Sequence, residues 1–156
     1  MTPILRRLAA TAALAGALAL SAAVPPVAQA SERTAYPSTA MEGLPYSGAV
    51  ATGDMVFVGG VLGTVRNRKE LVPGGITPET RQALAYVREM LEQAGSTLER
   101  TVKCTVLLAD IEDFPAMNAV FAETFPKDPP TRSTIIVPQI PLGAAVEVEC
   151  TALAGR

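Results

Sequence analysis

The segment between Thr77 and Gly95 carries the clearest folding signal in this chain. Thr77 can cap free amide groups, Pro78 suits the first helical position, and a glycine at position 95 belongs just past a helix end. We therefore expect an amphipathic helix at residues 78–94, whose apolar stripe requires a second layer to pack against. Its apolar residues recur three or four positions apart: Ala83, Leu84, Val87, Met90, Leu91 and Ala94.

Short apolar or alternating segments on both sides of this helix predict a β-sheet as that second layer. Two apolar runs, 46–51 and 55–60, surround Thr52-Gly53-Asp54 and predict a β-hairpin, because glycine supplies the turn geometry. Three further strands are expected, at residues 102–108, 132–137 and 145–153.

A second helix is expected near residues 114–125, with Asp113 as its N-terminal cap and Pro126 as the residue that ends it. The predicted order is therefore β-β-α-β-α-β-β. Two helices and five or six strands fit an α+β fold in two layers, with both helices packed on one face of a mixed sheet.

Alternation along the predicted strands sorts their side chains onto two faces of the sheet. A sheet face that its own helices leave uncovered usually packs against a partner, which predicts an oligomer. The face beneath the helices should carry Val102, Cys104, Val146 and Cys150. The opposite, uncovered face still carries the apolar residues Leu107, Ile136 and Leu153.

Residues 1–30 have the pattern of a cleaved signal peptide: basic Arg6-Arg7, an uncharged run from Leu8 to Val24, and Ala28-Gln29-Ala30. Cleavage after Ala30 would leave an N-terminal arm at 31–43 and a single domain at 44–156, in an exported periplasmic or secreted protein without a membrane anchor. An uncleaved membrane anchor is the alternative, although the run is short for a bilayer span. The arginine pair leaves the Sec and twin-arginine export routes both open.

The composition excludes several kinds of site. The chain has no histidine, two cysteines and a formal net charge of −2. It therefore contains no Ser-His-Asp triad, no Cys-His pair and no four-cysteine metal site. Acid–base chemistry falls to Asp, Glu, Lys, Tyr, a chain terminus or bound water. The acidic balance and the few aromatic residues argue against nucleic acid or an anionic membrane surface as the partner.

Three separated segments resemble one known family. The first is Leu44-Pro45-Tyr46-Ser47-Gly48-Ala49-Val50 with the following 56–60, and the second is residues 113–121. The third is Pro130-Thr131-Arg132-Ser133, with Val146-Glu147-Val148-Glu149 downstream. In this order they resemble the RidA (YjgF-like) family of enamine/imine deaminases, over about residues 44–154.

The resemblance implies a chorismate-mutase-like fold and a homotrimer with active sites in clefts between subunits. It also implies hydrolysis of 2-enamine or 2-imine acids, such as 2-aminoacrylate, to 2-keto acids and ammonia, without cofactor or metal. Two alternatives stay open. One is a non-catalytic module that binds a small carboxylate or keto acid; the other is the ribonuclease activity attributed to some relatives. The acidic balance and the missing histidine weigh against the ribonuclease.

Arg132 is the first catalytic candidate, because a guanidinium pairs with a carboxylate through two parallel hydrogen bonds. The matching arginine of the family holds the substrate's carboxylate. Glu147 matches a family carboxylate that orients the attacking water, although strand periodicity alone makes Glu149 an equal candidate. The resemblance also assigns substrate binding to Tyr46, Gly60, Asn118 and Ser133.

Gly59, Val61 and Thr134 depart from the family pattern, in which serine, a polar residue and cysteine are common at these positions. The first two departures make the expected pocket less polar. Cys104 and Cys150 lie on the apolar faces of two predicted strands. After export they could form a disulfide if their strands are neighbours, or they could remain two buried thiols.

Overall fold

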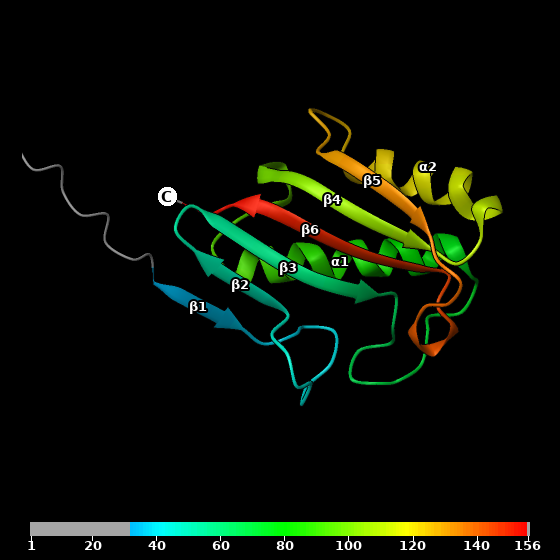
Figure 1. Cartoon of the computed structure of the whole chain (residues 1–156), viewed down its shortest axis with the longest axis horizontal. Coiled ribbons are helices and arrows are strands. Elements are labelled where there is room, and N and C mark those ends of the chain that lie inside the picture. Colours follow the sequence, from blue (N-terminus) through cyan, green and yellow to red (C-terminus); the bar gives the residue numbers. More distant parts are fainter. Residues whose placement is uncertain (1–31, 156) are drawn as a thin grey trace, which may run out of the picture.

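The computed structural model describes residues 32–155, so the expected signal peptide lies outside the described residues. The fold has two layers, a six-stranded mixed sheet and two helices on one of its faces (Figure 1). The elements are β1 (Arg33–Tyr36), β2 (Ala49–Thr52), β3 (Met55–Leu62), α1 (Ile76–Gln93), β4 (Thr101–Leu108), α2 (Phe114–Thr124), β5 (Thr131–Ile136) and β6 (Val146–Leu153). The predicted fold class is confirmed.

The strands lie in the order β1-β2-β3-β6-β4-β5. Strands β4 and β5 run parallel and are connected through α2, whereas all other neighbours in the sheet are antiparallel. Helix α1 packs against β3 and β6 in the centre of the sheet and against α2. Within the described residues, neither helix is long and apolar enough to cross a membrane.

The structure adds one strand to the predicted order. Strand β1 lies in the segment expected to be an arm, and it pairs with β2 along its whole length. Its sequence, Arg-Thr-Ala-Tyr, is mostly exposed and has no apolar alternation, so the pattern on which strand prediction depends is missing. The open edge of β2 provides the hydrogen-bonding partners instead.

The ends of the helices agree with the sequence only in part. Gly95 has a φ of 74° and its amide donates to Glu92, which confirms the predicted helix end. Thr77, however, lies inside α1. The residue before the helix is Gly75, which has a φ of 75°, and α1 begins at Ile76. Asp113 makes no capping bond, because a 3₁₀ turn runs directly into α2 and gives this residue helical dihedral angles.

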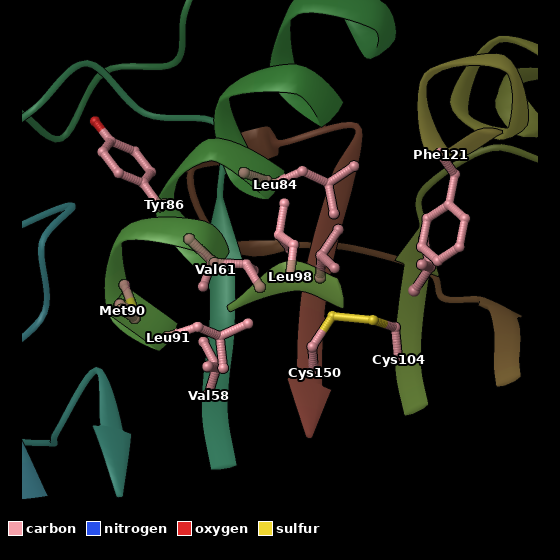
Figure 2. Close-up of a cluster of buried hydrophobic side chains, with 14 of the residues drawn as sticks. Val58, Val61, Leu84, Tyr86, Met90, Leu91, Leu98, Cys104, Phe121 and Cys150 are labelled. Atoms are coloured by element: carbon pink, nitrogen blue, oxygen red, sulfur yellow. A yellow bond between two sulfur atoms is a disulfide. The ribbon is translucent and has the colours of Figure 1, made fainter. Parts of the chain in front are cut away.

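The core forms where the apolar stripe of α1 meets the covered sheet face, as Figure 2 shows for Leu84, Met90 and Leu91 near Val58 and Val61. All five of these residues, two from β3 and three from α1, are buried. The helix side of this contact is therefore the predicted apolar stripe, whereas Val61 lies one residue past the apolar run expected at 55–60.

Two of the predicted face assignments are wrong. Val102 is 44% exposed, because a register shift between Thr101 and Lys103 turns Thr101 inward in its place. The parallel register pairs Ile136 with buried Leu108, so Ile136 belongs to the covered side of the sheet. The apolar β5 residue on the open face is its neighbour Ile135.

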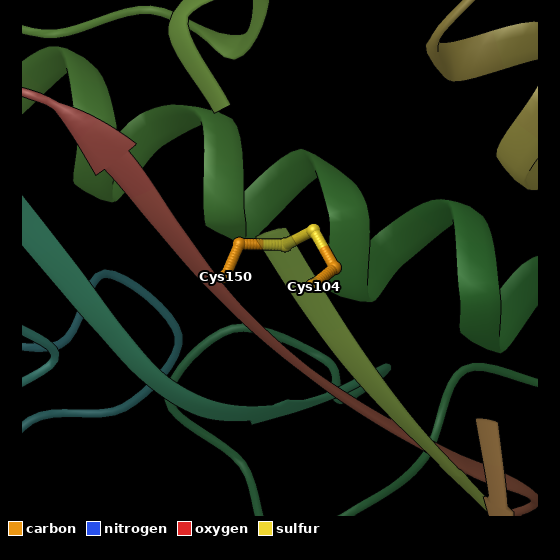
Figure 3. The surroundings of a disulfide bond; sticks show 2 residues. All are labelled: Cys104 and Cys150. Atoms are coloured by element: carbon orange, nitrogen blue, oxygen red, sulfur yellow. A yellow bond between two sulfur atoms is a disulfide. The ribbon is translucent and has the colours of Figure 1, made fainter. Parts of the chain in front are cut away.

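Cys104 and Cys150 face each other directly in β4 and β6, with Cα atoms 4.1 Å apart, and form a disulfide (Figure 3). Both residues are buried, at 1% and 2% exposure, in the core beneath α1. No other cysteine is present among the described residues. Of the two alternatives left open by the sequence, the structure contains the bonded one.

A buried carboxylate joins the two strands that carry part of the candidate site. Glu79, in the first turn of α1, accepts a hydrogen bond from the amide of Ala145 at 2.9 Å, just before β6. Gly63, just after β3, packs so closely on the backbone of Glu79 that a Cβ would collide with it. The end of β3 and the start of β6 are therefore fixed against the same turn of α1.

Candidate active site

The structure divides the candidate site residues between the two faces of the sheet. Arg132 pairs in register with buried Cys104 and its side chain contacts α2, so it lies on the helix side. Glu147 lies between Val146 and Val148, which face the core, so it points to the open side. Within one chain, the two catalytic candidates therefore do not meet.

The guanidinium of Arg132 is held by one face of α2. Its Nη2 donates to Oδ1 of Asn118 at 2.7 Å, and the group lies 4.5 Å from the ring centre of Phe121 and 5.7 Å from that of Phe114. Burial lowers the pKa of Arg132, although an arginine stays protonated in a protein. The aromatic rings favour the cation and fix the plane of its fork.

Arg132 is half-buried, yet it forms no ion pair with any residue among 32–155. Arg66 and Arg81, by contrast, each pair with a glutamate at 2.7 and 2.8 Å. The unpaired cation opens onto a pocket of about 340 Å³. Its lining is Asn118, Phe121, Ala122, Phe125, Pro129, Pro130 and Arg132. A half-buried positive charge without a carboxylate partner is suited to bind an anionic ligand.

The aromatic part of this arrangement was missed in the sequence, although a signal was present. Phe114, Asn118 and Phe121 are spaced four and three residues apart, which places them on the same face of a helix. Such a face, followed by an arginine on the next strand, could have predicted the cation–π contacts.

Gly60 and Glu147 touch each other on the open side of the sheet. Gly60 lies in an irregularity of β3 between Val58 and Val61, and a Cβ at this position would collide with Oε1 of Glu147. The absence of a side chain at Gly60 thus provides the space that the carboxyl group occupies. A pocket of about 100 Å³ adjoins the two residues.

Glu147 and Glu149 share one face of β6, but their surroundings differ. Burial raises the pKa of Glu147, and the negative charge of Glu149 raises it further. Glu149 itself is exposed, although it also lines the small pocket. A half-buried carboxyl group with a raised pKa is a better proton acceptor once ionised than an ordinary surface glutamate.

The remaining candidates, Tyr46 and Ser133, do not line the pocket at Arg132. Tyr46 is 60% exposed and lines, together with Gly60, a larger pocket of about 260 Å³. Ser133 is exposed and pairs in register with Thr105, so it points to the open side, away from Arg132. The chain thus has one group around Arg132 and Asn118, and a second around Tyr46, Gly60 and Glu147.

Residues 38–154 match the family model described as Endoribonuclease L-PSP. The chain is 41% identical to the 2-iminobutanoate/2-iminopropanoate deaminase of Capra hircus, over 71% of this chain and 81% of that protein. It is 38% identical to the chloroplastic Reactive Intermediate Deaminase A of Arabidopsis thaliana, over 69% of this chain and 58% of that protein. The crystal structure of the YjgF gene product from E. coli superposes with a TM-score of 0.71 at 27% identity, over 77% of this chain and 97% of that one.

Proposed function

Because the chain belongs to the Endoribonuclease L-PSP family, the family of the RidA (YjgF-like) proteins, we propose that it is an imine deaminase. It would hydrolyse 2-imino and 2-enamino acids of the 2-aminoacrylate type to 2-keto acids and ammonia. The observation that carries this proposal is the unpaired, half-buried guanidinium of Arg132. Relatives near 40% identity named as deaminases support it.

In this reaction, Arg132 would bind the substrate's carboxylate through its free N–H groups, while Asn118 keeps the guanidinium in place. Glu147 would orient a water molecule toward the carbon of the C=N bond and accept its proton. Water adds to that carbon, the C–N bond breaks, and ammonia leaves. Tyr46 and Gly60 would line the site beside the reacting carbon, with Ser133 as a further binding residue.

The division of these residues between two faces supports a site completed by a second subunit. Arg132 of one subunit would then face Tyr46, Gly60 and Glu147 of its neighbour. The uncovered sheet face provides a surface for association, since it exposes Phe57 (46%), Ile135 (48%) and Leu153 (42%). We take the assembly to be a homotrimer, as the resemblance implies.

Export is part of the proposal. Two observations support it: the signal-like pattern of residues 1–30, and the disulfide between Cys104 and Cys150, a bond typical of oxidising compartments. The mass of the protein isolated from its source should correspond to a chain that begins at Ser31. A mass that includes Met1-Thr2 would contradict cleavage.

Cleavage of RNA, which the family description names, is not proposed. The chain has no histidine and a formal net charge of −2, and neither feature favours binding or cleaving a polyanion.

The deaminase proposal is tested by generating imino acids in place with an L-amino-acid oxidase. Semicarbazide traps the imine, so an enzyme that hydrolyses it first lowers semicarbazone formation and raises the rate of keto-acid release. We expect the purified protein to compete effectively with the trap. A folded protein that accelerates the hydrolysis of none of several imines would contradict the proposal and favour the non-catalytic carboxylate-binding module.

The pH profile of this activity should report Glu147. As a base it acts only when ionised, so kcat/KM falls as the pH drops through its raised pKa. Glu149→Gln removes a neighbouring negative charge, lowers that pKa and should shift the acid limb to lower pH. Glu112→Gln, an exposed position outside the pockets described above, should leave the limb in place. An acid limb that is unmoved by Glu149→Gln would contradict the assignment.

A further inference from the structure

Tyr46 and Gly60 line a pocket of about 260 Å³ whose other residues take no part in the proposed reaction. Most of this lining is apolar and includes Met41, Leu44, Val61, Leu62, Pro141 and Leu142. Among residues 32–155, Lys69 is the one charged residue of the lining. The pocket therefore favours a ligand group that is itself apolar.

This pocket adjoins the place where the proposed chemistry would occur. Gly60 lines both this pocket and the small one beside Glu147. Leu62, which contributes to the apolar wall, pairs directly with Glu147 across β3 and β6. A substrate whose reacting carbon lies near Glu147 would thus have the apolar pocket within reach of its side chain.

Polar contacts hold the outer wall of the pocket, residues 38–44, against the loop that follows β3. Arg66 donates to the carbonyl oxygen of Thr39 and binds both carboxylate oxygens of Glu89, at 2.7 and 2.8 Å. The amide of Asn67 donates to the carbonyl of Ala40 at 2.9 Å. These contacts involve none of Tyr46, Gly60 and Glu147, so the pocket is formed before any substrate binds. Binding would then cost little conformational entropy of the protein.

We propose that this pocket receives the substrate's side chain and makes the enzyme selective for imino acids with apolar side chains of leucine or methionine size. The inference rests on the proposed deaminase function and names its substrate class. An alanine-type imine would leave the pocket to water, whereas a leucine-type side chain would bury its carbon atoms there. A glutamate-type side chain would place its charge among apolar groups, with only Lys69 at hand.

The first test is a substrate series with the unmodified protein. Imines are generated from alanine, leucine, methionine and glutamate, and each kcat/KM is referred to the measured rate of imine formation. We expect the leucine- and methionine-derived imines to exceed the alanine-derived one by about 10-fold or more. Equal values, or the glutamate-derived imine in first place, would overturn the inference but leave the deaminase function standing. Turnover of none of them would contradict the deaminase function itself.

The second test fills the pocket. Leu44→Trp places a large ring on a half-buried loop position and should lower the leucine-to-alanine ratio of kcat/KM about 10-fold. Ile111→Trp is the matched control, since Ile111 is 57% exposed and lines none of the pockets described above, so the ratio should not change. A ratio that is unaffected by Leu44→Trp would overturn the inference. If this variant does not fold, the substrate series still decides.

Discussion

Replacing Arg132 with alanine is expected to lower kcat/KM for every imino acid by about 100-fold or more. A bidentate, charge-assisted pair with a carboxylate contributes roughly 3 kcal/mol or more. Arg132 has no carboxylate partner among the described residues, and beside its bonds to Asn118 and Met117 it keeps N–H groups that can form such a pair. Arg132→Lys should recover little, because an ammonium group cannot donate two parallel bonds. Steady-state kinetics with the leucine-derived imine would measure both variants.

Arg81→Ala is the matched control for this experiment. Arg81 is also an arginine in contact with α2, but it is 57% exposed and pairs with Glu123 on the surface. Its loss should change kcat/KM by less than about 2-fold, since an exposed ion pair contributes little.

Keto-acid binding should be lost together with turnover in Arg132→Ala. If binding survives while turnover is lost, Arg132 is not the carboxylate clamp.

Arg132→Ala also makes it possible to test whether the site is shared between subunits. When the Arg132→Ala and Glu147→Gln proteins are mixed and refolded together, mixed trimers should form. In each of them, one site receives Arg132 from one subunit and Glu147 from another. In a random equimolar mixture, about three quarters of the trimers contain both variants, and each of these has one intact site of three. We therefore expect about a quarter of the wild-type activity from two variants that are almost inactive alone. No recovery in confirmed mixed trimers would place both residues in one subunit.

The sequence predicts those parts of the fold that depend on local periodicity. Helix α1 combines an apolar stripe with a C-terminal glycine, and both signals are found in the structure. Strand β1 has neither an apolar pattern nor a buried face, so only its neighbour reveals it. Val102 appears apolar and inward in the sequence, but a register shift against β6 turns it outward. Register is a property of the pair of strands and cannot be read from one strand.

The candidate site, too, is predicted only in part by the sequence. The sequence motifs identify the candidate residues. Their division between the two faces of the sheet follows from the alternation of side chains along each strand, since Arg132 and Ser133 are adjacent in sequence and point to opposite sides. Periodicity could not separate Glu147 from Glu149, because they share a face. Contact with Gly60 and burial distinguish them, and both depend on the tertiary packing of β3 against β6.

Removing the disulfide is the change expected to cost the most stability. The double variant Cys104→Ala/Cys150→Ala should have a free energy of unfolding about 2–4 kcal/mol lower than that of the oxidised protein. The bond closes a loop with a sequence separation of 46, and the entropy of the unfolded chain accounts for the upper end of this range. Urea unfolding followed by circular dichroism would measure the difference.

The reduced wild-type protein supplies the control, because it keeps both sulfur atoms and loses only the bond. Unfolded in the presence of dithiothreitol, it should approach the stability of the double variant. Under native conditions the same reductant should act slowly, since Cys104 and Cys150 are buried beneath α1 and reduction requires the strands β4 and β6 to open. Equal stability of the oxidised protein and the double variant would contradict this role. The bond therefore adds stability only where thiols are oxidised, since the same chain in a reducing environment would retain only the stability of the double variant.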